Sequence, residues 1–409
     1  MEMQKAGSFS LWWRESIDLQ SEILARLPAE FVYNYRIICQ QWNNFLSSNY
    51  FLRKWGETPF NRKQPRLVLL SANPKMSSMA FCFYTRTWIK SFSLSFLKDW
   101  TRLYWFCQSS VAGLILVHGV SDSTRTTISL CNPYTRAFVV IPLIILEPYV
   151  ECIVELENIN QKSDTAYKVV AAGSYHASLA GAFRRQMVGI YEPSQNRWII
   201  AGYFPEDLTL DTSSQLVFHN GSFYTHCRMV VDGTKGIVCF TIQLDGNNSA
   251  VELMPIPMLF VPYPEIVRVR NRRGEYFPVL SYPRMITCGS RLLLIAAKWM
   301  VENAGGERGD EVQIFEPVII MWEFRNEEHH AVDPSKSPRW EWVEIARMPS
   351  FLCNEWMNKL LPHAKDDFLV DCCIGVGDYV CFVHATCLIY ILKHVVTMFS
   401  FLCSWFDVY

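Results

Sequence analysis

YTRTW, at residues 84–88, returns as YTRAF at residues 134–138, a spacing of 50 residues. A looser copy, EPSQNRW at residues 192–198, places its aromatic residue 60 positions further on. In each copy a polar turn leads into a short apolar run, and the last two runs end at Pro142 and Pro205. A turn, an aromatic strand and a closing proline that repeat in this way predict a fold built from repeated β units.

Short β-rich runs continue this pattern from Arg66 onward. Two longer segments with the same outline end at Pro255 and Pro349, and the second of them carries an insertion. Repeats of about 50 residues are typical of kelch-type propeller blades, in which four antiparallel strands form a unit that stacks on its neighbours. We therefore predict an all-β kelch-like propeller of about six blades. Its units should begin near residues 66, 108, 167, 215, 284 and 372.

An irregular β-sandwich, or two unrelated β domains, is the alternative that the strand pattern leaves open. Kelch repeats usually begin with a pair of glycines. Here single glycines stand at those positions: Gly113, Gly173, Gly221 and Gly289. The blades are therefore divergent and their number stays open. The final blade lacks the polar turn, tryptophan and proline of the others, so we expect it to be incomplete.

The chain before Arg66 has a helical period instead. Four apolar residues fall on one face of a predicted helix: Leu19, Ile23, Leu24 and Leu27. This helix should end at Leu27, because a residue before a proline disfavours helical geometry, and Pro28 can open a second helix. A third helix is predicted with an apolar stripe of Ile37, Ile38, Trp42 and Phe45. Three helices this short bury little surface, so they should need a partner or the next domain.

Composition limits the classes of partner. The chain has 409 residues, which favours more than one domain, and its 38 Lys and Arg nearly balance 39 Asp and Glu. No overall field therefore attracts nucleic acid or a membrane surface. The 14 cysteines lie in apolar contexts, such as Cys82, Cys131, Cys239 and Cys381, which favours reduced thiols. The first residues lack the apolar core of a signal peptide, so we expect a location in the cytoplasm, the nucleus or both.

The C-terminal segment at residues 387–406 is almost wholly apolar. Lys393 and His394 interrupt it, and the remaining run from Val395 to Phe406 has 12 residues. A membrane-spanning helix needs roughly 17 to 25 residues. A final buried pair of strands or an aberrant chain end is therefore preferred over a membrane anchor.

The helical segment resembles the F-box. The residues that match the F-box pattern are Leu19, Ile23, Leu24, Leu27, Pro28, Cys39 and Trp42. Cys39 is expected to pack and Trp42 to anchor the third helix. Glu15 and Ser16 stand where the family has its first Leu-Pro pair, so one apolar anchor is absent. Over residues 12–385 the chain is similar to plant F-box proteins with a kelch-related second half.

This resemblance implies a substrate-recognition subunit of an SCF-type cullin-RING ubiquitin ligase. The F-box would dock on a Skp-family adaptor, and through it on a cullin, while the propeller would bind a target protein for ubiquitination. The implied domains are an F-box at residues 12–55, a linker at 56–65, a propeller at 66–386 and an atypical apolar tail at 387–409. No catalytic residue, cofactor or metal is expected.

Motifs that carry chemistry are sparse. The sequence has no Gly-rich phosphate loop, HExxH, paired CxxC or nucleophile elbow. Cys372 and Cys373 are neighbours whose side chains would point to opposite faces of a strand, which favours a structural role. EEHH, at residues 327–330, lies in a polar insertion and favours a solvated loop over a metal site.

One dense basic cluster, RVRNRRG at residues 268–274, contains Arg268, Arg270, Arg272 and Arg273. Its simplest interpretation is a solvated hairpin turn. The functional alternative is a grip on an acidic or phosphorylated motif of a target protein.

Two rival functions remain open at this point. The chain could be a propeller scaffold that no longer docks the adaptor, as the missing Leu-Pro pair would allow. It could also be a galactose-oxidase-like copper enzyme, which would require tyrosine, cysteine and histidine side chains that converge on one site.

Overall fold

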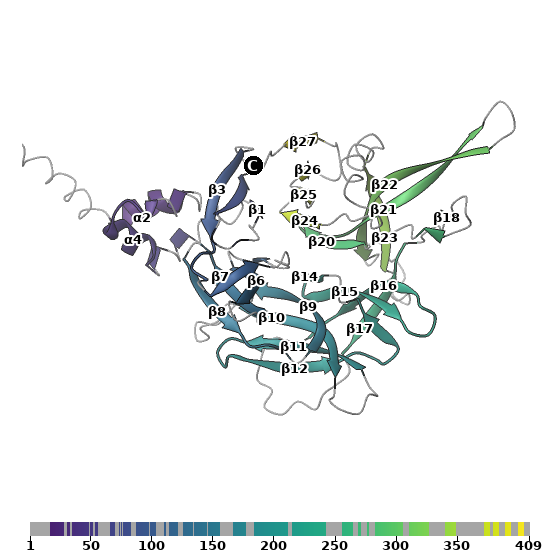
Figure 1. Ribbon diagram of the computed structural model, residues 1–409, viewed down its shortest axis with the longest axis horizontal. Helices are drawn as coiled ribbons and strands as arrows, with labels where there is room; N and C mark the ends of the chain where they lie inside the picture. Colours follow the sequence, from purple (N-terminus) through teal and green to yellow (C-terminus); the bar gives the residue numbers. More distant parts are fainter. Residues whose placement is uncertain are drawn as a thin grey trace, which may run out of the picture. The chain divides into compact units, whose positions relative to one another are not determined.

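The structure is a computed structural model of the 409-residue chain (Figure 1). It describes residues 17–27, 31–32, 35–48, 50–51, 54–55, 66–69, 73, 75, 77–82, 87–97, 99–103, 110–111, 114–121, 126–133, 135–144, 146–155, 167–176, 184–211, 215–242, 256–264, 269–270, 276–277, 283–305, 311–326, 340–348, 372–376, 379–383, 389–393 and 400–404. The chain divides into two compact units, Met1–Ile141 and Pro142–Tyr409. The predicted domain boundaries at residues 55 and 65 stay predictions.

The first unit begins with the helical region. It contains α2, Ile17–Ala25, and α4, Gln40–Leu46, with further helical residues at 31–32, 35, 50–51 and 54–55. α2 ends just before the Leu27 position at which the sequence predicted a stop. Ile37 and Ile38 lie in a turn before α4, so the predicted third helix began too early. The described residues give two helices of full length, and a complete three-helix unit stays a prediction.

Two antiparallel sheets follow in the first unit. The first sheet contains β1 (Arg66–Leu69), β2 (Ser77–Cys82) and β3 (Thr87–Ser93), in the order β1-β2-β3. The second contains β4 (Trp100–Leu103), β5 (Ser110–Val111), β6 (Leu114–Ser121), β7 (Thr126–Asn132) and β8 (Ala137–Ile141). Its order is β4-β6-β7-β8, and β5 also pairs with β6. β4 and β5 thus share one side of β6 as an interrupted strand.

The second unit opens with two further antiparallel sheets. One contains β9 (Leu146–Glu155), β10 (Tyr167–His176), β11 (Arg184–Glu192) and β12 (Arg197–Tyr203). The other contains β13 (Leu208–Leu210), β14 (Leu216–His219), β15 (Ser222–Met229), β16 (Lys235–Phe240) and β17 (Met258–Pro262). Its order is β13-β15-β16-β17, with β14 also paired to β15, so the interrupted first strand recurs here.

The remaining strands complete the second unit. β18 (Val269–Arg270) pairs with β19 (Tyr276–Phe277). The next sheet contains β20 (Arg284–Cys288), β21 (Arg291–Gly305), β22 (Glu311–Asn326) and β23 (Trp340–Arg347). β21 and β22 form the long hairpin at the upper right of Figure 1. The last sheet contains β24 (Cys372–Val376), β25 (Tyr379–Val383), β26 (Ile389–Lys393) and β27 (Ser400–Ser404).

The C-terminal apolar segment is part of this last sheet. β26 and β27 pair along their full lengths, from Ile389↔Ser404 to Lys393↔Ser400. The described residues of the C-terminal segment therefore form a strand pair in a four-stranded sheet, while the burial predicted for this pair and the propeller boundary at residue 386 stay predictions. No described helix is long and apolar enough to cross a membrane.

The repeated motif forms the same hairpin three times. In each copy the aromatic residue faces the residue seven positions earlier: Phe81↔Trp88, Cys131↔Phe138 and Tyr191↔Trp198. The residue just before the second strand adopts positive φ in two copies, at Arg136 and Asn196. Asn196 also accepts a hydrogen bond from the Tyr191 hydroxyl at 2.8 Å. The predicted unit of polar turn and aromatic strand is therefore confirmed in the second and third copies, and the turn of the first copy, at residues 83–86, lies outside the described residues.

The hairpin also corrects the predicted unit boundaries. The second and third sheets begin at Trp100 and Leu146, not near residues 108 and 167, because their first strands were not recognised. β17 follows Pro255 instead of preceding it, and Gly173 lies inside β10, paired with Met187, instead of at a strand opening. By the hairpin alignment, the three described strands of the first sheet correspond to the last three of the next two sheets. A closed ring of six kelch blades stays a prediction.

Both faces of the central sheets of the second unit are apolar. The sheets β9–β12 and β13–β17 share a core that includes Val170, Val188, Phe223 and Val238. On the other face of β15 and β16, Tyr224 and Ile237 pack against Met285, Leu292 and Leu294 of the next sheet. Because alternate residues of a strand point to opposite faces, each sheet needs a neighbour on either side. The repeated units therefore stabilise one another by stacking.

Candidate functional site

The apolar residues of α2 divide between two faces. Leu24 and Ala25 are buried in a small core with Val32, Leu46 and Phe51, and Leu24 is only 7% exposed. Leu19 and Ile23 are 54% and 50% exposed. They lie one helical turn apart, so they share a face. The single apolar face predicted from the sequence is thus two: one that packs inward and one that lies in water.

Other large apolar side chains of the helical region are also exposed. Together with Leu19 and Ile23, the exposed apolar set comprises Phe31, Ile37, Ile38 and Tyr50. Periodicity found Ile37 and Ile38 but assigned them to a helical stripe. Phe31 and Tyr50 do not belong to an apolar period in the sequence. Their exposure becomes visible only in the structure, where neighbouring apolar side chains are buried.

Polar contacts hold α2 against the segment that follows α4. The Tyr50 hydroxyl donates to Asp18 Oδ1 at 2.7 Å, and Lys54 Nζ lies 2.8 Å from Glu22 Oε1. The hydrogen bond from Lys54 holds the pKa of the Glu22 carboxyl below its usual value. These contacts are in solvent, so they orient the segments and add little stability.

At the start of α4, Cys39 does not have the role that the sequence predicted for it. Cys39 is exposed and has extended backbone geometry at the N-cap, where its Sγ accepts from the Trp42 amide at 3.5 Å. The expected packing role of this thiol is therefore wrong. Trp42 does pack on the helical core, with its ring edge-on to Tyr35 at 5.6 Å. Leu27 also borders this core, and Pro28 lies outside the described residues.

The predicted arginine cluster is only partly described. Arg270 belongs to the short strand β18, opposite Tyr276. Arg268, Arg272 and Arg273 lie outside the described residues, as does EEHH at 327–330. Their target-binding role stays a prediction.

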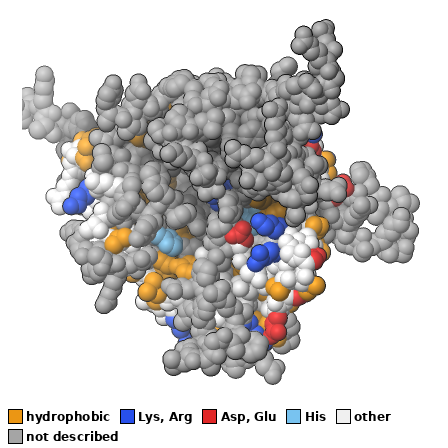
Figure 2. All heavy atoms as spheres, turned by 45° about the vertical axis from the view of Figure 1, so that its right-hand side comes forward, with side chains coloured by type: hydrophobic (Ala, Val, Ile, Leu, Met, Phe, Trp, Pro, Cys, Tyr) orange, Lys and Arg blue, Asp and Glu red, His pale blue; other side chains and the backbone are white. Residues whose placement is uncertain are grey.

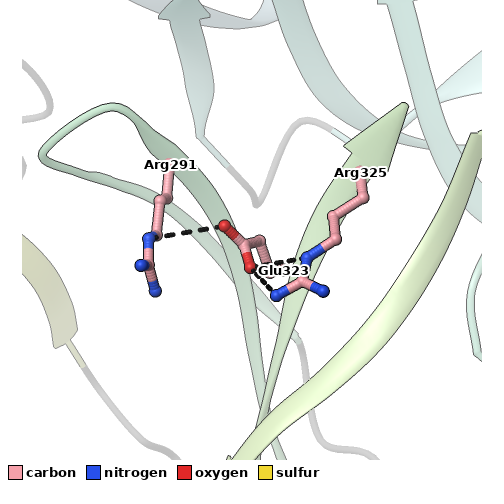
Figure 3. A network of polar contacts seen from close by, with 3 residues as sticks. All are labelled: Arg291, Glu323 and Arg325. Carbon is pink, nitrogen blue, oxygen red and sulfur yellow. Dashed lines mark hydrogen bonds and ion pairs between the residues drawn. The ribbon is translucent and has the colours of Figure 1, made fainter. Parts of the chain in front are cut away.

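A different arginine group is well defined on the long hairpin. Glu323 of β22 lies between two arginines, Arg291 of β21 and Arg325 of β22 (Figure 3). Arg291 Nε is 3.4 Å from Glu323 Oε1, and Arg325 donates through two nitrogens to Oε2 at 2.8 and 2.6 Å. On the face drawn in Figure 2, Lys or Arg side chains likewise lie close to an acidic side chain. This local pairing fits the balanced net charge of the chain.

A buried polar group lies between two sheets of the second unit. The His226 ring, on β15, hydrogen-bonds through Nδ1 to the Tyr263 hydroxyl, and its Nε2 has no partner among the described residues. Tyr224 and Cys239 face each other on β15 and β16, and the His219 ring lies 6.5 Å from that of Tyr224. These are residue types that a copper site would require. Tyr224 contacts both His219 and Cys239, apart from the pair of His226 and Tyr263, and no group of three His, Cys, Asp or Glu side chains that could hold a metal ion occurs among the residues that the structure describes.

The buried histidine predicts a pH dependence of stability. Burial lowers the pKa of His226 to about 4, Arg284 acts in the same direction and Asp211 opposes it. Between the usual value of 6.5 and about 4, the unfolded chain binds a proton that the folded chain does not. The free energy of unfolding should therefore fall by about 1 kcal/mol per pH unit as the pH decreases through this window.

Urea denaturation between pH 4 and 7 measures this effect. His226→Gln should flatten the dependence, because glutamine carries no titrating group. An equal slope in both proteins would show that the buried histidine is not its source.

The fold and the site together define a mostly β-sheet protein with an exposed apolar surface on its helical region. No family model matches the chain. The chain is 24% identical to the F-box protein At5g49610 of Arabidopsis thaliana, over 67% of this chain and 70% of that protein. It is 19% identical to F-box only protein 6 of the same plant, over 85% of this chain and 61% of that protein. These similarities, at low identity, support a plant F-box protein.

Among solved structures, the chain matches a mutant of Aleuria aurantia lectin in complex with Fucalpha1-6GlcNAc. The TM-score is 0.34 at 8% identity, over 80% of this chain and 87% of that chain. A score this low assigns neither a fold nor a ligand to the chain.

Proposed function

We propose that the chain is the substrate-recognition subunit of an SCF-type cullin-RING ubiquitin ligase. Its helical region docks a Skp-family adaptor and through it a cullin, and its β region, a kelch-like propeller, binds a target protein for ubiquitination. The protein is non-catalytic and acts in the cytoplasm, the nucleus or both. The similarity to Arabidopsis F-box proteins supports this proposal.

The observation that carries the adaptor assignment is the exposed face of α2. Large apolar side chains in water mark a protein-contact surface, and Leu19 and Ile23 are held one turn apart on a helix whose other face is packed. Leu24, Leu27 and Trp42 support that helix from inside, and Cys39 caps α4. The seven residues that match the F-box pattern thus divide into contact residues and support residues, with Pro28 still unassigned.

Removal of the exposed face should weaken docking strongly without unfolding the chain. The double variant Leu19→Ser, Ile23→Ser should lower adaptor affinity by about 100-fold, since two apolar anchors leave the centre of the interface. Calorimetric titration with a purified Skp-family adaptor measures the change. The thermal stability of the free chain should stay near that of the wild type, because both side chains already lie in water.

Two further variants make this test specific. Leu143→Ser removes an equally exposed apolar residue outside the helical region and should leave adaptor binding unchanged. Leu24→Ala should instead lower both stability and binding, because it opens the helical core. Wild-type affinity in the double variant would contradict adaptor docking through α2 and favour the scaffold alternative.

The copper-enzyme alternative has a test of its own. His219 and Cys239 both lie next to Tyr224, near one end of β15. This proximity is the observation that favours a copper site. Purified chain with stoichiometric copper by elemental analysis would support it. Chain that binds the adaptor and retains no copper would favour the receptor.

A further inference from the structure

The turn between β15 and β16 presents two valines to water. Val230 is 58% exposed and Val231 is 85% exposed. Among the described residues, Val231 is the most exposed of the large apolar side chains. Most exposed apolar side chains on a soluble protein are isolated and need no explanation. Two adjacent exposed valines at the tip of a hairpin do require an explanation, because polar residues in such a turn would interact more favourably with water.

This valine turn, residues 229–234, is firmly held. The Met229 amide donates to the Thr234 carbonyl at 2.9 Å, and the Gly233 amide donates to the Met229 carbonyl at 3.0 Å. Gly233 has a φ of 72°, a conformation that favours glycine. The Thr234 amide donates to Asp232 Oδ1 at 2.9 Å. A rigid turn loses little conformational entropy when a partner binds.

Charges of opposite sign flank the valine turn. The Val230 amide donates to the Asp207 carbonyl at 2.7 Å, which ties the turn to the β12–β13 connection, where Glu206 and Asp207 are exposed. Arg228 and Lys235 face each other at the base of the turn and are also exposed. In the sheet order β13-β15-β16-β17, Asp207 precedes β13 and Lys235 begins β16. Asp207 and Lys235 therefore lie on opposite sides of β15, whereas Arg228 lies on β15 itself, between Thr209 of β13 and Lys235 of β16, and Asp232 in the turn is a further exposed carboxylate.

We propose that the valine turn and its two charged flanks bind an extended segment of the target protein, in which an apolar residue stands between a basic and an acidic side chain. Lysine or arginine of the target pairs with Glu206 and Asp207, the apolar residue covers Val230 and Val231, and the acidic side chain pairs with Arg228 and Lys235. Such complementarity fixes direction and register more than affinity. This inference rests on the proposed receptor function and names the chemistry of its target.

Selection from a random peptide library, with the purified full-length chain as bait, tests the proposal. The wild type should enrich peptides in the order basic, apolar, acidic or its reverse. The double variant Glu206→Lys, Asp207→Lys should enrich acidic residues in place of basic ones. Val231→Ser should weaken binding of the selected peptides by about tenfold, as loss of an apolar anchor does. Asp99→Lys and Leu143→Ser change equally exposed residues elsewhere and should have no effect.

The outcomes separate this surface from the receptor function. Identical peptide selection by the wild type and the charge-reversal variant overturns the docking surface, and so does the absence of any enriched peptide. Adaptor titration of the same variants reports independently on the helical region. A chain that binds the adaptor but selects no peptide refutes only the valine turn, whereas a chain that selects peptides but binds no adaptor refutes only the ligase assignment.

Discussion

Lys168→Ala should lower the free energy of unfolding of the second unit by about 3 kcal/mol at neutral pH, because it leaves a buried carboxylate without its cation. Lys168 Nζ of β10 lies 3.0 Å from Glu192 Oε2 of β11, and the two side chains are only 8% and 12% exposed. The Ser194 hydroxyl donates to Glu192 Oε1 at 3.0 Å. Denaturation in urea, with hydrogen exchange of the β10 and β11 amides, measures the loss.

The effect should depend on pH in a defined direction. Burial alone raises the pKa of the Glu192 carboxyl, but hydrogen bonds from Lys168 and Ser194 outweigh it and hold the pKa below the usual 4.5. The stabilisation is therefore complete above pH 4.5 and is lost as the pH falls through the lowered value. The difference between Lys168→Ala and the wild type should narrow in acid.

Two matched variants complete this experiment. The double variant Lys168→Met, Glu192→Leu replaces the pair by apolar side chains and should restore most of the stability. Arg347→Ala breaks an ion pair with Glu344 that lies largely in solvent and should change stability by less than about 0.5 kcal/mol. A Lys168→Ala variant as stable as Arg347→Ala would contradict the burial of the pair.

Gly236→Ala should lower the free energy of unfolding by about 3 kcal/mol, at the upper end of overpacking effects. Gly236 is buried in β16 opposite Pro262, and an added Cβ would collide with the Val261 carbonyl oxygen and lie 2.8 Å from the Phe260 ring. Backbone cannot move aside without breaking the β16–β17 ladder. The gain of up to about 1 kcal/mol from a stiffer unfolded chain is too small to offset this.

Gly189→Ala is the matched control. An added Cβ at Gly189 would also lie 2.8 Å from its nearest neighbour, but that neighbour is the terminal methyl of Ile144, which can rotate. The expected loss is about 1 kcal/mol. Exchange of the β17 amides should accelerate in Gly236→Ala alone. Equal losses in the two variants would mean that the Val261 carbonyl is not the obstacle.

The repeated hairpin could be predicted because its determinants are local. A polar turn and an aromatic residue seven positions after its partner are visible in the sequence, and Trp88, Phe138 and Trp198 all occupy that place. The first strands of two sheets were missed. β4, with the sequence WTRL, and β9, which contains Pro148 and three glutamates, have no long apolar run of their own and gain their pairing only from β6 and β10.

The sequence predicted which apolar residues belong to the helical region, but not which of them point into its core and which point into water. The helical period placed Leu19, Ile23 and Leu24 on one face, yet it cannot tell which part of a wide apolar face packs on the protein core and which part stays exposed. Ile37 and Ile38 were assigned to a helix for the same reason. Polar pairs such as His226 with Tyr263, 37 residues apart, depend on strand packing and leave no local signal.

The exposed apolar set has a consequence for the life of the chain before it meets a partner. Leu19, Ile23 and their companions in this set remain in water in the free protein, where contact with any other apolar surface is favourable. Under the proposed function, chain made in excess of the adaptor should therefore self-associate and be removed by quality control. The amount of receptor in the cell would then follow the supply of adaptor, and recombinant production should succeed best when both are synthesised together.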